Sequence, residues 1–99
     1  MTYSIIFGSK VEDDLTETFD YYEQQLEGLG NDFLLSAEAT LNLIARNPLH
    51  FQKIYQNKRK ANLQRFPFGV FYILSKEYII IIAIIHLTRN PKVWRSRKK

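Results

Sequence analysis

The sequence predicts an α+β fold in which a helical hairpin packs on one face of a small antiparallel sheet. Three observations support this prediction: a strand-like segment near the N-terminus, two stretches of helical periodicity after it, and a second half of strand-like runs and turns. With 99 residues, 45% apolar and 24% charged, the chain has the size and composition of one globular domain. We therefore expect a single domain over residues 1–99.

The N-terminal part predicts a strand followed by a helix. Residues 2–7 are rich in branched and aromatic side chains, as in a β-strand. Ser9 followed by Glu12 matches a capping box, so we expect a helix to begin near Lys10. Apolar residues at helical spacing define one face of this helix: Val11, Leu15, Phe19, Tyr22 and Leu26.

A glycine-rich link ends this helix and precedes a second one. Residues 28–30 read Gly-Leu-Gly, and glycine suits the left-handed conformation in which many helices end. Asn31 can then cap a helix that ends before Pro48. The apolar side of this second helix carries Leu34, Ala37, Leu41 and Ile44. Because the link is short, we expect an antiparallel helical hairpin.

The second half predicts three or four antiparallel strands. The expected segments are a loop or short strand over residues 51–55, a strand over about 61–66 that Pro67 interrupts, and strands over 70–75 and 78–87. The last strand is apolar on both faces, with Ile79, Ile81, Ala83 and Ile85 on one and Ile80, Ile82, Ile84 and His86 on the other. Either it is a central strand enclosed in the protein's own core, or a partner chain covers its outer face.

The two halves of the chain carry opposite charge. Residues 1–45 hold nine acids and one base, a net charge of −8, while residues 46–99 hold thirteen bases and one acid, a net charge of +12. Such asymmetry predicts an acidic side and a basic side. The basic side suits phosphate-rich nucleic acid or an acidic partner segment, and two solvated faces are the simpler alternative. Residues 95–99 are expected to form a frayed basic tail.

The composition argues against several classes of protein. There is no cysteine for a disulfide framework or a thiolate metal site, and the two histidines are far apart in sequence. Met1 leads directly into the first strand without the basic start of a signal peptide. The longest apolar run, residues 78–85, is much shorter than the roughly 20 residues that span a bilayer. We therefore expect a cytoplasmic protein that needs neither metal nor cofactor.

Several short motifs, in order along the chain, resemble the RelE/ParE toxin superfamily. They are Tyr21-Tyr22-Glu23, Gly28-Leu29-Gly30 with Phe33, Arg65-Phe66-Pro67-Phe68 with Phe71-Tyr72, and His86-x-x-Arg89-x-Pro91-x-x-Trp94 with Arg97. The resemblance covers about residues 3–97. It implies a β-α-α-β-β-β fold and the toxin of a type II toxin–antitoxin pair, such as a plasmid stabilisation protein, which a cognate antitoxin neutralises.

The resemblance leaves the target open. RelE-like members cleave mRNA in the ribosomal A site, whereas ParE-like members poison DNA gyrase and are not nucleases. The first hypothesis is a translation-inhibiting endoribonuclease that cleaves ribosome-associated mRNA without a metal. The alternatives are a non-enzymatic gyrase inhibitor and a degenerate member that binds its antitoxin without being toxic.

RNA cleavage of this type needs an acid, a base and donors for the charged phosphorane. Arg65 corresponds by resemblance to the sheet arginine of RelE-like toxins, and with Arg89 it is a candidate phosphate ligand. Histidine is the residue type most often used for proton transfer near neutral pH, so His86 is the candidate acid or base. Candidates for further nucleic-acid binding are Lys58, Arg59, Lys60, Trp94, Arg95 and Arg97.

Each candidate also has a structural interpretation. Arg65 could pair with a helix acid such as Glu23, and Trp94 could pack under the sheet and anchor the tail. His86 and Arg89 could order the loop between them. The lysine pair and tyrosine of the best-studied RelE-like enzymes have no clear counterpart here, and Glu77 is the single acid of the second half. A Glu–His pair would therefore need an acid from the helices.

Overall fold

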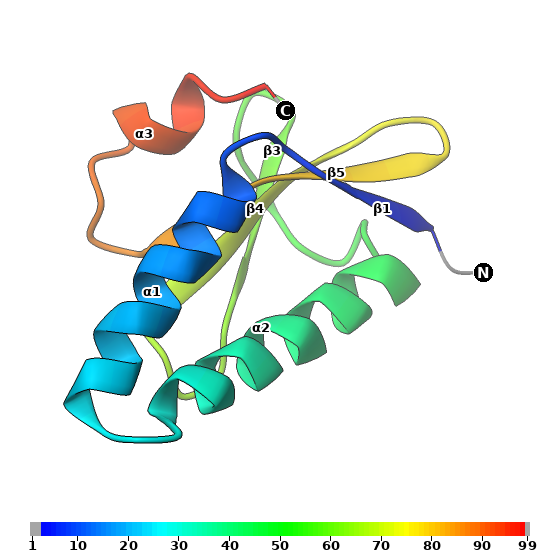
Figure 1. Ribbon diagram of the computed structural model, residues 1–99. Helices are drawn as coiled ribbons and strands as arrows, with labels where there is room; N and C mark the ends of the chain where they lie inside the picture. The colour runs from blue at the N-terminus through cyan, green and yellow to red at the C-terminus, as the bar shows by residue number, and fades with distance from the viewer. Residues whose placement is uncertain (1–2, 99) are drawn as a thin grey trace.

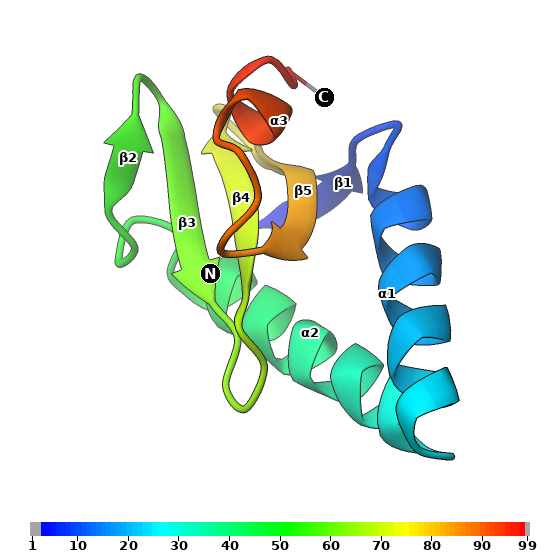
Figure 2. The same cartoon turned by 90° about the vertical axis from the view of Figure 1, so that its left-hand side faces the viewer.

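Two helices, α1 (Val11–Gln25) and α2 (Leu29–Arg46), lie on one face of a five-stranded sheet in the computed structural model, which describes residues 3–98 (Figures 1 and 2). The strands are β1 (Ser4–Phe7), β2 (Lys53–Tyr55), β3 (Lys58–Asn62), β4 (Phe68–Leu74) and β5 (Tyr78–His86), in the spatial order β1-β5-β4-β3-β2. A short helix, α3 (Lys92–Arg95), lies against the other face. The predicted α+β class and element order are confirmed, and no helix in the described residues is long and apolar enough to cross a membrane.

The sheet is mixed, because β1 pairs with β5 in parallel. Ser4 lies opposite Tyr78 and Phe7 opposite Ile81, while β2, β3, β4 and β5 are antiparallel neighbours as predicted. A parallel pair requires a long connection, which the helical hairpin supplies at the start of the path from β1 to β5. Residue 2, predicted to begin the first strand, lies outside the described residues.

The helices form where predicted, but the N-cap residues are not the predicted ones. Lys10, not Ser9, is the N-cap of α1, and it makes no side-chain capping hydrogen bond. Gly28, not Asn31, is the N-cap of α2, with a left-handed φ of +90° that favours glycine. The segment that was expected to end α1 therefore also begins α2.

Glu23 takes the role predicted for Asn31. Its carboxylate accepts hydrogen bonds from the backbone N–H groups of Gly28, at 3.0 and 3.1 Å, and Gly30, at 3.0 Å. A carboxylate is favoured there because the first N–H groups of a helix lack partners and its N-terminus is electropositive. A Cβ at Gly30 would lie 2.7 Å from the Phe19 ring and 2.9 Å from the Phe19 carbonyl oxygen. The Tyr-Tyr-Glu and Gly-Leu-Gly motifs thus build the turn of the hairpin.

The main core lies between the hairpin and the sheet. On α2 its largest residue is Phe33, which is fully buried, whereas Leu34, predicted on the buried face, is 37% exposed. Ala37 and Ile44 are buried and Leu41 packs on the core, as predicted, so the predicted face is wrong only in having Leu34 in place of Phe33. Tyr22, Phe66 and Phe68 surround Phe33 with ring centroids 5.0–5.7 Å apart, a separation at which aromatic rings attract one another.

Both faces of β5 are covered by the chain itself, which confirms the first of the two interpretations. Ile79, Ile81 and Ile84 belong to the core under the helices. Ile82, Ala83 and Ile85 form a second core with Phe71 and Trp94 on the outer face. The register against β4 shifts between Phe71 and Tyr72 and leaves Ile82 without a direct partner. The predicted alternation therefore reverses at this irregularity.

Gly30→Ala is expected to lower the free energy of unfolding by about 1–3 kcal/mol, as overpacking usually does. The new Cβ would meet the Phe19 backbone, which cannot rotate away, and this outweighs the roughly 1 kcal/mol by which alanine favours a helix. Urea unfolding followed by the fluorescence of Trp94, the single tryptophan, measures the change. The control is Gly69→Ala, whose Cβ would meet flexible side chains at 3.1–3.3 Å; an equal loss there would contradict the argument.

The buried hydroxyl of Tyr72 makes the stability of the fold decrease at alkaline pH. Its hydroxyl donates to the Pro48 carbonyl oxygen, and burial raises its pKa from 10.0 to about 12, against a smaller opposing effect of Arg59. Because the folded state favours the protonated phenol, this contribution to stability is complete below pH 10 and is lost as pH rises through about 12. Tyr72→Phe should cost about 1 kcal/mol at pH 7 and flatten the stability curve above pH 10. Parallel curves for the two proteins in urea unfolding would contradict this assignment.

Candidate functional site

The predicted catalytic residues lie in two separate clefts. His86 and Arg89 line a cleft of about 450 Å³ between α1 and the end of β5, which we call the α1–β5 cleft. Arg65 lines a different groove of about 630 Å³ that runs along α2, the α2 groove. The structure therefore brings His86 and Arg89 together but does not bring Arg65 to them.

His86 orders the loop that follows β5. Its Nδ1 accepts a hydrogen bond from the Thr88 backbone N–H at 3.1 Å and lies 2.7 Å from the Thr88 hydroxyl. An accepting Nδ1 is unprotonated, so the ring proton of the neutral form is on Nε2. The ring also lies edge-on to Phe68, with 5.2 Å between the ring centroids. This contact agrees with the interpretation in which His86 orders the loop that follows it, and the ring is the acceptor of the hydrogen bond.

Acidic, phenolic and basic side chains line the α1–β5 cleft together. Glu17, Tyr21 and Tyr22 line it from α1, opposite His86 and Arg89. Burial, and to a smaller extent the neighbouring Tyr21, raises the pKa of Tyr22, which favours its protonated phenol. The helix acid that a Glu–His pair would need is therefore available in Glu17.

Arg65 is an exposed residue in a tight turn. Its side chain is 65% exposed, and its backbone has a left-handed φ of +74°, which non-glycine residues rarely adopt. Its guanidinium lies 3.6 Å from the carboxylate of Asp32 and 5.5 Å from the centre of the Phe66 ring. The helix acid that pairs with it is thus Asp32, whereas Glu23 caps α2.

Trp94 is part of the outer core and not of an exposed binding face. It is 7% exposed, and its ring stacks on Phe71 at 4.8 Å and meets the Tyr55 ring edge-on at 6.1 Å. In this position the ring is unavailable to stack on a base. The alternative interpretation, in which Trp94 packs on the sheet and anchors the C-terminal segment, agrees with the structure.

The other basic candidates divide into buried and exposed residues. Lys58 is 4% exposed, and the half-buried Arg59 donates to the Phe51 carbonyl oxygen at 2.6 Å. Lys60 is half-buried, while Arg95 is exposed and lies 4.6 Å from the centre of the Tyr55 ring. The Lys58–Lys60 stretch thus forms the first three residues of strand β3.

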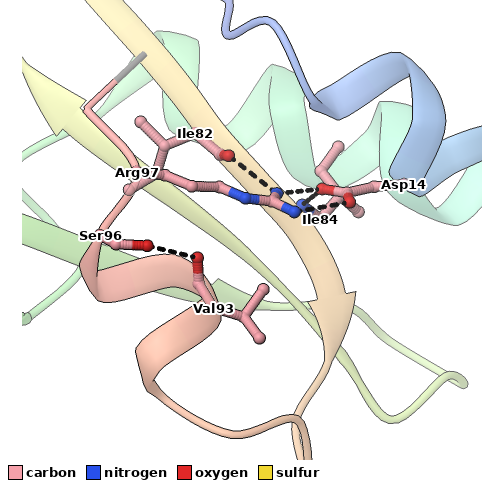
Figure 3. Close-up of polar contacts among 6 residues, drawn as sticks. All are labelled: Asp14, Ile82, Ile84, Val93, Ser96 and Arg97. Carbon is pink, nitrogen blue, oxygen red and sulfur yellow. Dashed lines mark hydrogen bonds and ion pairs between the residues drawn. The ribbon is translucent and has the colours of Figure 1, made fainter.

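Arg97 forms a buried ion pair with Asp14 of α1 (Figure 3). Its two terminal nitrogens lie 2.6 and 3.1 Å from the two carboxylate oxygens, and the side chains of Arg97 and Asp14 are 12% and 7% exposed. This two-point geometry is the strongest form of an arginine–carboxylate contact. Arg97 is therefore occupied and does not face a nucleic acid.

The same pair completes the edge of β5 where β1 ends. Beyond the last β1 partner, Ile81, Asp14 accepts the Ile84 N–H at 3.1 Å and Arg97 donates to the Ile82 carbonyl oxygen at 3.1 Å (Figure 3). The expectation of a frayed tail is therefore wrong for Arg95–Arg97, because this segment is held by α3 and by the ion pair. Lys99 lies outside the described residues.

Sequence reasoning missed Asp14 as a buried residue and Glu23 as a cap. Asp14 follows Val11 by three positions and so lies on the apolar face of α1, which is the signal that could have identified it. Its partner is 83 residues away in sequence, and no local pattern indicates that pairing. In residues 3–98, no group of three or more His, Cys, Asp or Glu side chains could hold a metal ion.

This fold is that of the RelE/ParE class of toxins. The chain superposes on a chromosomal ParDE toxin–antitoxin system from P. aeruginosa with a TM-score of 0.76 and 16% identity, over 86% of this chain and 96% of that one. It superposes on the RelBE2 toxin–antitoxin complex from Mycobacterium tuberculosis with a TM-score of 0.58 and 17% identity, over 87% and 99% of the two chains.

The sequence assigns the family more narrowly. Residues 5–91 match the model of the ParE toxin of the type II toxin–antitoxin system parDE. The chain is also 33% identical over 95 residues to Toxin ParE2 of Mycobacterium tuberculosis strains CDC 1551 and H37Rv, covering 92% of this chain and 88% of the relative. The protein belongs to the ParE toxin family of type II toxin–antitoxin systems.

Asp14→Asn and Arg97→Met should each lower the free energy of unfolding by about 3–5 kcal/mol, because each leaves a buried charged or strongly polar partner uncompensated. The double variant should lose less than the sum of the two. Urea unfolding measures the losses, and a red shift of Trp94 fluorescence reports detachment of α3. Asp13→Asn, at the exposed neighbouring position, is the control, and strictly additive losses would argue against direct coupling.

Proposed function

We propose that this ParE-family toxin acts by binding its target, as a non-enzymatic inhibitor of the gyrase type, and not by cleaving RNA. The observation that carries the proposal is the separation of Arg65, in the α2 groove, from His86 and Arg89, in the α1–β5 cleft. A phosphodiester cannot use Arg65 in one groove and His86 in the other cleft, because both groups must reach the same reacting atoms.

The remaining candidates for RNA binding support the same conclusion. Trp94 is committed to the outer core and Arg97 to Asp14. The Nδ1 of His86 accepts from Thr88, which leaves Nε2 as the nitrogen that could serve a substrate. Two residues that were candidates for nucleic-acid binding, Trp94 and Arg97, thus hold the C-terminal segment on the sheet.

We further propose that a cognate antitoxin covers the α2 groove. Leu35 and Leu43 are 64% and 48% exposed, and both line this groove with Arg46 and Arg65. Exposed apolar patches of this kind usually mark interfaces, and the two arginines suit acidic side chains of a partner. The structural relatives come from toxin–antitoxin systems, which supports a partner of this class.

A second candidate function is mRNA cleavage in the α1–β5 cleft alone. Glu17 and His86 would be its base and acid, and Arg89 would bind the phosphate, since all three line one cleft. This arrangement differs from the predicted one in replacing Arg65 by a helix acid. Because these three residues line the same cleft, RNA cleavage is the second function to test beside gyrase inhibition.

The two candidates differ in what His86→Gln does. For gyrase inhibition, the purified protein should block supercoiling and leave ribosome-bound mRNA intact in toeprinting. His86→Gln should then keep its inhibitory potency within about twofold, because His86 is half-buried and lies outside the α2 groove. Growth arrest should be relieved by co-expression of the antitoxin. Toeprints that show cleavage by the wild type and none by His86→Gln would instead establish the nuclease.

A further inference from the structure

Lys58 is a buried cation that forms no ion pair with a carboxylate of residues 3–98. Within residues 3–98 the charged residues that are more than nine-tenths buried are Asp14 and Lys58, at 7% and 4% exposure. Asp14 has Arg97, whereas the ion pairs of the described residues include none with Lys58. Its ammonium lies 5.6 Å from the centre of the Tyr55 ring. A ring compensates a buried ammonium less well than an anion does.

The surroundings of Lys58 form a cleft of about 460 Å³ at one end of the sheet. Three segments line it: the turn between β2 and β3, the facing ends of β4 and β5, and the C-terminal segment. Lys58 is joined there by Lys98, the amides of Gln56 and Asn57, and the hydroxyl of Ser75. The apolar part of the lining consists of Ile73, which is the cross-strand neighbour of Lys58, together with Leu74 and Ile80.

We propose that this cleft binds a phosphate group, with the ammonium of Lys58 as its principal ligand. The described lining offers two ammonium groups, two amides and a hydroxyl, and contains no carboxylate. A phosphate has enough acceptor oxygens for several of these donors, and its double negative charge matches the two lysines. The acid nearest in sequence to this lining, Glu77, is exposed in the turn after Ser75 and does not line the cleft.

This site is distinct from both clefts described above. Its lining shares no residue with the α1–β5 cleft or the α2 groove, so the binding can be tested whatever the target of the toxin is. Arg95, which lies 4.6 Å from the Tyr55 ring, and Lys58 are both close to that ring. They add positive potential beside the cleft, which favours entry of an anion.

The test is calorimetric titration of the full chain with inorganic phosphate against chloride at equal ionic strength. The wild type should bind phosphate saturably, and Lys58→Met should weaken binding by about tenfold or more, the effect of losing a charge-assisted hydrogen bond. Lys53→Met removes the same charge from an exposed position of β2 that does not line the cleft, and it should bind like the wild type. Equal binding by the wild type and Lys58→Met would overturn the proposal.

A second variant covers the case in which Lys58→Met does not fold. Asn57→Asp places a carboxylate in the lining at an exposed turn position and should abolish phosphate binding with Lys58 in place. Phosphate-dependent shifts in the amide NMR spectrum should centre on Gln56, Asn57 and Ser75, and shifts elsewhere would contradict the site.

Competition by 5′-phosphorylated but not 5′-hydroxyl oligonucleotides would identify a nucleic-acid end as the source, and competition by neither would indicate free phosphate.

Discussion

The ion pair between Asp14 and Arg97 fixes how the parts of this fold meet. It joins the first turn of α1 to the segment after α3, and it satisfies the backbone of β5 where β1 ends. Through this contact the C-terminal segment is held over the outer face of the sheet, where Trp94 covers Phe71. A nine-residue strand with two apolar faces needs such a cover, since the hairpin can bury only one of them.

The pair also changes the meaning of the charge asymmetry along the sequence. The acidic first half and the basic second half are not simply two solvated faces, because contacts between them hold the structure together. Asp14 pairs with Arg97 inside the protein, and Asp32 pairs with Arg65 at its surface. The buried pair matters more for stability, because the exposed pair at 3.6 Å is screened by water and salt.

The sequence was sufficient to predict elements with a local signal. The periodicity of α1 and α2, the strands and the hairpin link all depend on neighbouring residues, and these predictions hold to within a few positions. The cap predicted at Asn31 failed because Glu23 reaches forward to Gly28 and Gly30 and replaces it. The predicted alternation of the two faces of β5 fails at Ile82. The shift in register there arises from the pairing of β5 with β4, so neither strand's sequence indicates it alone.

The candidate site was harder to predict for a related reason. A basic or aromatic residue can bind a ligand or hold the fold, and the choice depends on partners that are distant in sequence. Trp94 and Arg97 have structural contacts because Phe71 and Asp14 lie beside them, and the cleft that His86 lines is completed by Glu17 from α1.

The motifs that carry the family resemblance are therefore mainly motifs of folding. Glu23 and Gly30 build the hairpin turn, and Arg97 and Trp94 hold the C-terminal segment on the sheet. A scaffold specified in this way can be inherited while the surfaces that meet the target diverge. For this reason, membership of the ParE family establishes the toxin class and does not by itself decide between gyrase and RNA as the target.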